Sequence, residues 1–433
     1  MLLNILIAGL GYAAEEATGD NVILSLDELI QIALTNNPQV DSAFAQKDQR
    51  EGQLTQARSS YLPQLSINGD YSRVKVDGLQ PEDEGNIAHG GANVSQLIYD
   101  FGGATGAIDA GRANLEASFA NLEKVSQGIV LQVRQACYKV LERKHLIKVA
   151  EQAVSNYEQH LDRAKEYFKA GVRTRIDVVN AEVELSSARL RLLQSQYDLK
   201  SARVELERIL GKVPSNGKYA LVPILDGLDR LHNKMPPLPG PLAKLLETAN
   251  EQRQDILQQK AFIKTAEAVI RQADSGYWPS IGATAGLDTY DTDLSTFQDQ
   301  WNVGVGFTWE LFSGFRTRGK QVEAKAFHRE NLYRLHDLEL MVTQEVTDSL
   351  IRADENRESV LLNMETVRLA TENLKLASER YKAGLNDMIE YNDAELRFTT
   401  AQGNLIASYF AYLSSLARID YSIGTPAPLI AQQ

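Results

Sequence analysis

The chain has 433 residues, of which 43% are hydrophobic and 24% are charged, and its formal net charge at pH 7 is −12. This acidic balance, without any cluster of lysine and arginine, excludes nucleic acid as a partner, because phosphate neutralisation requires a concentrated basic face. The lone Cys137 excludes an intrachain disulfide, and the lack of any internal run of roughly 18 apolar residues excludes a helical membrane anchor.

The N-terminal segment, 1–14, predicts a secretory signal peptide. An apolar stretch from Leu2 to Leu10 is followed by Gly11 and Ala13, small residues spaced as at a cleavage site. The basic segment that usually precedes such a stretch is missing, since no lysine or arginine occurs before Lys47. The alternative is an ordinary buried strand.

The dominant feature of the chain is an internal duplication, in which residues 25–212 reappear as residues 241–424. The offset in numbering is 216 between Tyr61-Leu62-Pro63 and Tyr277-Trp278-Pro279, 211 between Phe101-Gly102-Gly103 and Phe312-Ser313-Gly314, and 213 between Lys169-Ala170-Gly171 and Lys382-Ala383-Gly384. Small changes of offset place the length differences in loops. The repeats are separated by a proline-rich linker over 213–240, and a tail covers 425–433.

Proline-free stretches in both repeats permit long helices. In the first repeat, apolar residues recur at steps of three and four between Leu115 and Leu141, which is the spacing of an amphipathic helix. We expect a long helix and a return helix in each repeat, over 104–169 and 174–210 in the first and over 318–382 and 386–423 in the second. At 1.5 Å per residue, each long helix would extend for about 100 Å. Such helices are also typical of a soluble coiled-coil scaffold.

Short strands lie between these helices. Residues 301–310 alternate strictly, with Trp, Val, Val, Phe and Trp on one face and Asn, Gly, Gly, Thr and Glu on the other. This pattern predicts one strand of a hairpin over 280–311. The first repeat holds the equivalent hairpin over 64–99, in which a weaker strand runs from about Gly91 to Tyr99. The sequence therefore predicts a mainly α fold with a small β part.

The length and composition of the strands suit a membrane barrel. Strands of about ten residues match the tilted strands of outer-membrane barrels, and Tyr99, Trp301 and Trp309 lie where an aromatic girdle is expected. Four strands cannot close a barrel, and an open edge in a bilayer leaves backbone groups unpaired at several kcal/mol each. Three copies would supply twelve strands, so we expect a homotrimer. The alternative is a four-stranded sheet packed on the helices of its own chain.

Several motifs together carry a resemblance to a known family. They are Ser25-Leu26-Asp27-Glu28-Leu29-Ile30, Tyr61-Leu62-Pro63-Gln64-Leu65, Tyr99-Asp100-Phe101-Gly102-Gly103 and Trp309-Glu310-Leu311-Phe312-Ser313-Gly314. By their order, duplication and spacing, the chain after its signal resembles the TolC-type outer-membrane efflux proteins. The resemblance implies a trimeric duct, in which a twelve-stranded β-barrel in the outer-membrane lipid continues into a periplasmic α-helical barrel.

The resemblance also implies the function and the partners. The duct would be the exit of a tripartite efflux or type I secretion system, joined by a periplasmic adaptor (membrane fusion) protein to an inner-membrane pump, which is either proton-driven or of the ABC type. The substrate and the class of pump are left open. The runner-up function is a non-conducting periplasmic coiled-coil scaffold.

The two helix-to-helix turns farthest from the strands are the candidate sites. By resemblance, Glu390 and Asp393 match the family's constriction carboxylates; at a spacing of i, i+3, they share one helical face. In a trimer they would form two stacked rings that attract cations and give a cation-preferring, pH-sensitive constriction. The equivalent pair in the first repeat is Asp177 and Asn180.

The same turns hold the expected gate latch and adaptor contacts. Asp177 and Tyr381 match latch positions of the family, whereas Asn386 stands where a family member has arginine, which leaves Arg173 or Arg175 as substitutes. The glycines of the turns suit the positive φ that ends a long helix. The expected adaptor contacts are Gly171, Val172, Gly384 and Leu385.

An enzymatic function is not expected. The six histidines show no metal-ligand spacing, and no Ser or Cys lies in a nucleophile motif. The glycines at 102–106 precede a helix but lack the Lys-Ser/Thr ending of a phosphate-binding loop. No cofactor or metal is therefore predicted, and the energy for transport would come from another protein.

Overall fold

The computed structural model describes residues 22–75, 84–214, 219–225, 235–291, 298–383, 385 and 388–428. The predicted signal peptide at 1–14 lies outside them. The chain divides into two compact units: a tip unit of Met1–Ala33, Gln132–Pro237 and Asn356–Ser414, and a sheet unit of Leu34–Leu131, Leu238–Glu355 and Ser415–Gln433. Two long helices, α3 (Gly103–Lys169) and α8 (Arg316–Lys382), contribute residues to both units.

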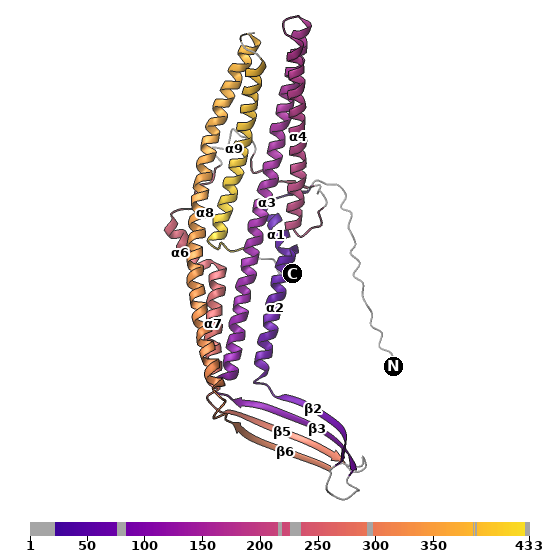
Figure 1. Cartoon of the computed structure of the whole chain (residues 1–433), viewed down its shortest axis with the longest axis vertical. Coiled ribbons are helices and arrows are strands. Elements are labelled where there is room, and N and C mark those ends of the chain that lie inside the picture. The colour runs from indigo at the N-terminus through magenta and orange to yellow at the C-terminus, as the bar shows by residue number, and fades with distance from the viewer. Residues whose placement is uncertain are drawn as a thin grey trace. The chain divides into compact units, whose positions relative to one another are not determined.

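The helices of the two repeats correspond one to one, and each pair has identical lengths (Figure 1). These pairs are α1 (Leu26–Asn36) and α6 (Leu242–Gln252), α2 (Pro38–Ser59) and α7 (Gln254–Ser275), α3 and α8, and α4 (Arg175–Ile209) and α9 (Met388–Ser422). The predicted fold class, a duplicated and mainly α chain with a small β part, is confirmed. None of the helices in the described part of the chain is long and apolar enough to cross a membrane.

The junctions between strands and long helices correct one detail of the duplication. The two residues before α3, Phe101 and Gly102, have φ of 56° and 109°, and the two before α8, Gly314 and Phe315, have φ of 59° and 64°. In the structure Phe101 therefore corresponds to Gly314, whereas the sequence match paired it with Phe312, two positions earlier. The match by residue type was displaced because glycine is the second of the two positive-φ residues in the first repeat, Gly102, but the first of them in the second repeat, Gly314.

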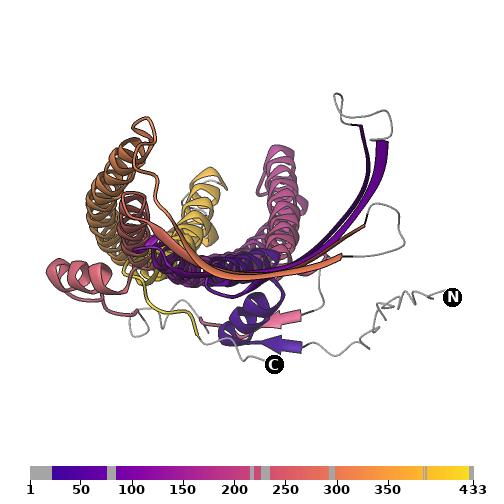
Figure 2. The same cartoon turned by 90° about the horizontal axis from the view of Figure 1, so that it is seen from below.

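The four strands of the sheet unit form one antiparallel sheet in the order β2-β3-β5-β6, which is curved in Figures 1 and 2. The strands are β2 (Gln64–Lys75), β3 (Glu84–Tyr99), β5 (Ser280–Asp291) and β6 (Gln298–Thr308). Strand β3 begins earlier than the Gly91 expected from the sequence, because its pairing with β2 continues across Gly90 and Gly91, where the alternation of side chains is lost. Within one chain, β2 and β6 are the edge strands.

The sheet has one apolar and one polar face. Across the four strands, Leu65 pairs with Val94, Val94 with Ala285, and Ala285 with Val303. The adjacent row on the other face is Ser66, Asn93, Gly286 and Asn302. The apolar row is open to solvent in the single chain, with Leu65 69% and Val303 74% exposed. This sheet therefore does not pack its apolar face on the helices of its own chain.

A second, two-stranded sheet belongs to the tip unit. Strand β1 (Val22–Leu24) pairs in parallel with β4 (Tyr219–Leu221), and the two arrows lie side by side in Figure 2. Strand β4 lies inside the proline-rich linker, for which the sequence predicted no strand. So short a segment cannot show a period, and the pairing could not be recognised from the pattern.

Candidate functional site

The two helix-to-helix turns of the tip unit are held by a shared apolar core. Helices α3 and α4 each contribute a stripe at the i, i+4, i+7 spacing of one helical face. Helices α8 and α9 close the core with two tyrosines and a methionine. Its buried members are Tyr157, Leu161, Ala164, Ala181, Leu185, Ala188, Tyr381, Met388 and Tyr391.

The first turn is fixed by capping interactions at both of its helices. Gly171, with φ of 72°, ends α3, and the Val172 amide donates back to the Tyr167 carbonyl at 3.0 Å, which satisfies an orphan carbonyl of the helix. Thr174 caps α4, and its amide and hydroxyl donate to the Asp177 carboxylate at 2.9 and 2.8 Å. Val172 is 69% exposed, so the predicted adaptor-contact position is accessible in the single chain.

The second turn repeats the first closing bond. The Leu385 amide donates to the Arg380 carbonyl at 2.9 Å, just as the Val172 amide donates to Tyr167 at the same spacing in sequence. Leu385 is 71% exposed. The other two predicted residues of this turn, Gly384 and Asn386, lie outside the described residues.

The two predicted constriction carboxylates both lie in the first turns of α9, are exposed, and are ion-paired. A Glu390 oxygen lies 3.4 Å from a guanidinium nitrogen of Arg380, near the end of α8. An Asp393 oxygen lies 2.8 Å from a guanidinium nitrogen of Arg397, one turn further along α9. Sequence reasoning missed both arginines. The i, i+4 spacing of Asp393 and Arg397 was a signal that could have identified that pair, whereas the other pair depends on the geometry of the turn.

Two of the expected latch residues, Asp177 and Tyr381, lie among the described residues, where no hydrogen bond joins them. Asp177 accepts from Thr174, and the Tyr381 hydroxyl is buried with no hydrogen-bond partner among the described residues. Burial raises the pKa of Tyr381, and the charge of Asp177 adds to this effect while Arg173 opposes it. The Arg173 guanidinium lies 5.5 Å from the centre of the Tyr381 ring, a cation–π distance. Arg173 is therefore the described residue that bridges from the first turn to Tyr381.

A buried polar cluster beneath this turn was not predicted. Glu395 is 1% exposed; its carboxylate accepts from the Asn156 amide at 2.7 Å and from the Tyr391 hydroxyl at 3.2 Å. Burial raises the pKa of Glu395 against these two hydrogen bonds. The His160 ring lies 3.8 Å from the Tyr391 ring, centre to centre, and burial followed by the charges of Arg163 and Lys382 lowers the pKa of His160 to about 4.

The predicted girdle residues belong to the sheet unit and are exposed on the single chain: Tyr99 is 50%, Trp301 76% and Trp309 50% exposed. Further exposed aromatic side chains, which the sequence analysis missed, gather near Tyr99 at the helix-proximal end of the sheet. Phe101 contacts Tyr99 edge-on at 4.7 Å and stacks on Trp278 at 5.4 Å. Their positions in turns, outside the alternating strand pattern, are the reason that they were missed.

Metal binding depends on the grouping of ligand side chains in the described residues. Within them, no three His, Cys, Asp or Glu side chains are grouped so that they could hold a metal ion. The exposed groups at the turns are the apolar side chains of Val172 and Leu385 and the ion-paired carboxylates of Glu390 and Asp393.

Comparison with known proteins gives one consistent result. The family of outer membrane efflux proteins matches residues 29–212 and 245–425. The outer membrane protein TolC of Vibrio cholerae serotype O1 is 23% identical over 430 residues, covering 96% of this chain and 94% of TolC. TolC of Escherichia coli K12 is 22% identical, covering 93% of this chain and 82% of TolC. The crystal structure of the Vibrio cholerae outer membrane protein VceC superposes with a TM-score of 0.78 at 18% identity, covering 93% of this chain and 97% of that one.

Proposed function

Because this chain belongs to the family of outer membrane efflux proteins, we propose that it is the trimeric exit duct of a tripartite efflux or type I secretion system. Its location is the outer membrane, as for its relatives, and its family is one of transport proteins. The observation that carries the proposal is the two-faced, open-edged sheet. Its apolar face is uncovered in the single chain, and the outer edges of strands β2 and β6 have no partner strand among the described residues.

Trimerisation resolves both features of the sheet. In a bilayer, each unpaired backbone group of an edge strand costs several kcal/mol, so the edges must pair with other copies. Three copies of a four-stranded sheet give twelve strands, an even number within the range of outer-membrane barrels. The exposed apolar row then faces lipid, and the polar row of serine, asparagine and glycine faces a water-filled lumen.

The spacing of the tryptophans supports this orientation. Trp301 lies on the apolar face of β6 and Trp309 directly follows the strand, and an extended chain of this length between them spans about 27 Å. With a strand tilt of about 40°, the distance across the membrane is about 20 Å, close to the roughly 25 Å apolar band that aromatic girdles flank. Tyr99 lies at the same end of the sheet as Trp309, because its pairing with Ile281 continues to Phe307.

The two helix-to-helix turns of the tip unit indicate which proteins the duct would contact. Turns that expose Val172 and Leu385 at the ends of paired helices offer apolar contacts to the helical tips of a periplasmic adaptor protein. The adaptor would join the duct to an inner-membrane pump, either proton-driven or of the ABC type. We place the constriction at Glu390 and Asp393, and we assign the latch to Tyr381 with Arg173, alongside the cap residue Asp177.

Single-channel recording of the purified protein in planar bilayers tests the proposal. A duct should show a discrete conductance and run as a trimer on native gels. Trimeric protein of full helical content without conductance would refute the duct and favour a non-conducting periplasmic scaffold. A soluble oligomer in the periplasmic fraction, instead of protein in the outer-membrane fraction, would also favour the scaffold.

A further inference from the structure

The constriction carboxylates have arginine partners supplied by their own chain. Arg380 and Glu390 approach to 3.4 Å across the second turn, and Arg397 and Asp393 approach to 2.8 Å along α9. Glu390, Asp393 and Arg397 follow one another at steps of three and four, so they share one face of α9. Any surface that presents the two acids therefore presents at least one guanidinium group as well.

Comparison of the two repeats shows that acids and arginines occur together. The two tips can be aligned by the helix ends that flank each turn, Lys169 with Lys382 and Arg175 with Met388. At the places of Arg380, Asp393 and Arg397, the first repeat then has Tyr167, Asn180 and Glu184. The first tip thus lacks both arginines and one of the two acids. The helices are otherwise equal in length, so the charge pattern is a property of the second tip and not of the fold.

The ends of the helices stabilise this arrangement. Arg380 lies in the last turn of α8, where the carbonyl end of the helix dipole favours a cation, and Glu390 lies in the first turn of α9, where the amide end favours an anion. Arginine stays protonated at any physiological pH. The arginine therefore carries its positive charge where it meets Glu390 across the turn.

We infer that Arg380 and Arg397 neutralise the constriction, so that this duct passes cations and anions with little preference; the inference rests on the proposed function. Both ion-pair distances are well below the Debye length of about 8 Å at physiological ionic strength, so a permeating ion experiences each pair as nearly neutral. In a trimer, each ring of three carboxylates is matched by a ring of three guanidinium groups. The cation preference expected from the acids alone is thereby lost, and the duct accepts substrates of either charge.

The test is the cation-to-anion permeability ratio, measured from the reversal potential of single channels in a KCl gradient. For the wild type, we expect a ratio near one. In Arg380→Gln/Arg397→Gln, the uncompensated acids should raise the ratio at least about tenfold, because a constriction lined by one sign of charge concentrates counter-ions. Glu390→Gln/Asp393→Asn should move the ratio in the opposite direction.

Two control variants separate charge from structure. Arg380→Lys/Arg397→Lys retains the positive charges and should keep the wild-type ratio. Arg368→Gln removes an arginine from an equally exposed pair with Glu365 on α8, at 2.7 Å. Arg368 lies about 18 Å along the helix from Arg380, which is beyond the Debye length, so this variant should also keep the wild-type ratio.

The possible outcomes are distinct. A cation-selective wild type whose ratio is unchanged in Arg380→Gln/Arg397→Gln would overturn the inference and leave the duct intact. A lysine variant that behaves as the glutamine variant would also overturn it, because the effect would then be one of shape. Absence of conductance from trimers of wild type and all variants would refute the proposed function, and the inference with it.

Discussion

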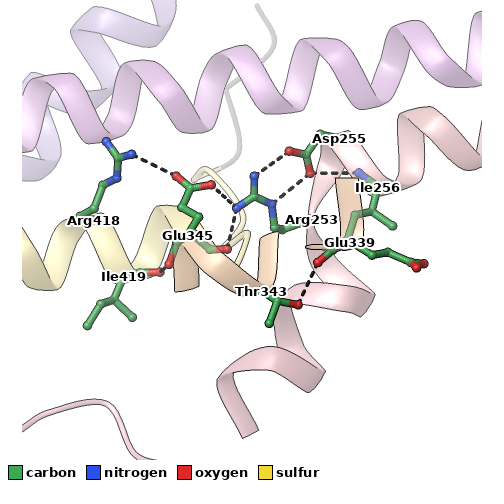
Figure 3. A network of polar contacts seen from close by, with 9 residues as sticks. Arg253, Asp255, Ile256, Glu339, Thr343, Glu345, Arg418 and Ile419 are labelled. Carbon is green, nitrogen blue, oxygen red and sulfur yellow. Dashed lines mark hydrogen bonds and ion pairs between the residues drawn. The ribbon is translucent and has the colours of Figure 1, made fainter. Parts of the chain in front are cut away.

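Removal of Arg253 should destabilise the sheet unit more than any other single loss of charge in it. Arg253 precedes α7, and its side chain is only 9% exposed. Figure 3 shows its polar contacts. Its guanidinium group donates to the Asp255 carboxylate at 2.6 and 3.0 Å, to Glu345 on α8 at 2.7 Å, and to the Ser422 carbonyl at the end of α9 at 3.0 Å. One side chain thus joins three helices. The substitution that tests this is Arg253→Met, which retains an apolar side chain of similar length.

The magnitude follows from the groups left unpaired. Breaking a buried ion pair by removing one partner costs about 3–5 kcal/mol. Glu345 is 26% exposed and keeps Arg418 at 3.1 Å, so the loss falls mainly on Asp255, which is 13% exposed. We therefore expect a value near the lower limit, about 3 kcal/mol. Arg418→Met is the matched control, because Arg418 is half exposed and its pair with Glu345 is worth less than about 1 kcal/mol.

The expected pH window also follows from the pair. Burial disfavours the Asp255 carboxylate, but the hydrogen bonds and charge of Arg253 outweigh it and hold the pKa of Asp255 below its usual value. A lowered pKa stabilises the folded state above the unfolded pKa, which is about 3.9, and this stabilisation is lost as the pH falls below it. The difference between wild type and Arg253→Met should therefore be constant from pH 8 to pH 5 and decrease only at lower pH.

The assay is the rate at which the helical circular dichroism of the detergent-solubilised protein is lost at a fixed high temperature, because many large proteins unfold irreversibly. If the network is absent from the transition state, about 3 kcal/mol corresponds to about a hundredfold faster loss. Arg253→Met/Asp255→Asn should recover part of this, because asparagine can still accept from the Ile256 amide, which donates to Asp255 at 2.9 Å. Equal rates for Arg253→Met and Arg418→Met, or no recovery in the double variant, would refute the reasoning.

Three further changes test other parts of the structure. Val303→Lys, on the apolar face of β6, should destabilise the inserted barrel by about 2–4 kcal/mol, as measured by urea unfolding in lipid vesicles. Asn302→Lys, on the polar face, should be tolerated. Equal effects of the two changes would contradict the assignment of faces. Gly424→Ala should cost more than about 1 kcal/mol in the same assay, because φ is 77° and a Cβ would lie 2.8 Å from the backbone nitrogen of the residue that caps α7; a neutral result would reject this close contact. His160→Phe should flatten the acid dependence of stability. Burial lowers the pKa of folded His160 to about 4, so the folded state keeps its full stability above the unfolded pKa of about 6.5 and loses about 2 kcal/mol at pH 5, where the unfolded chain binds the proton. A His160→Phe profile parallel to that of the wild type would reject the prediction.

The architecture could be predicted because its signals are long or repeated. A duplication over most of the chain and a strict alternation over 301–310 each combine many residues into one inference. Strand β4 and the positive φ of Phe101 and Phe315 depend instead on very short segments, whose conformations are selected by neighbours distant in sequence. Such features become visible only when the chain is folded.

The Arg253 network illustrates the same limit. Arg253 occupies the place that Asn37 has in the first repeat, since each immediately precedes the second helix of its repeat. Asn37 before Pro38 is a recognisable helix cap, and its side chain accepts from the Gln39 amide at 2.8 Å. The role of Arg253 depends on Glu345 and Ser422, which are 92 and 169 residues away. A local signal therefore indicates the cap in the first repeat, whereas no local signal existed for the second.

These differences between the repeats show how a duplicated chain can have two unlike turns. The helices have the same lengths, so each repeat brings its turn to the same place in the fold, and selection can change the turns without changing the scaffold. The first turn is capped by Thr174 and Asp177 and exposes Val172. In the second turn, an ion pair between Arg380 and Glu390 connects the end of α8 to the start of α9. An exposed ion pair contributes less than about 1 kcal/mol, so this pair determines the charge of the second turn more than its stability.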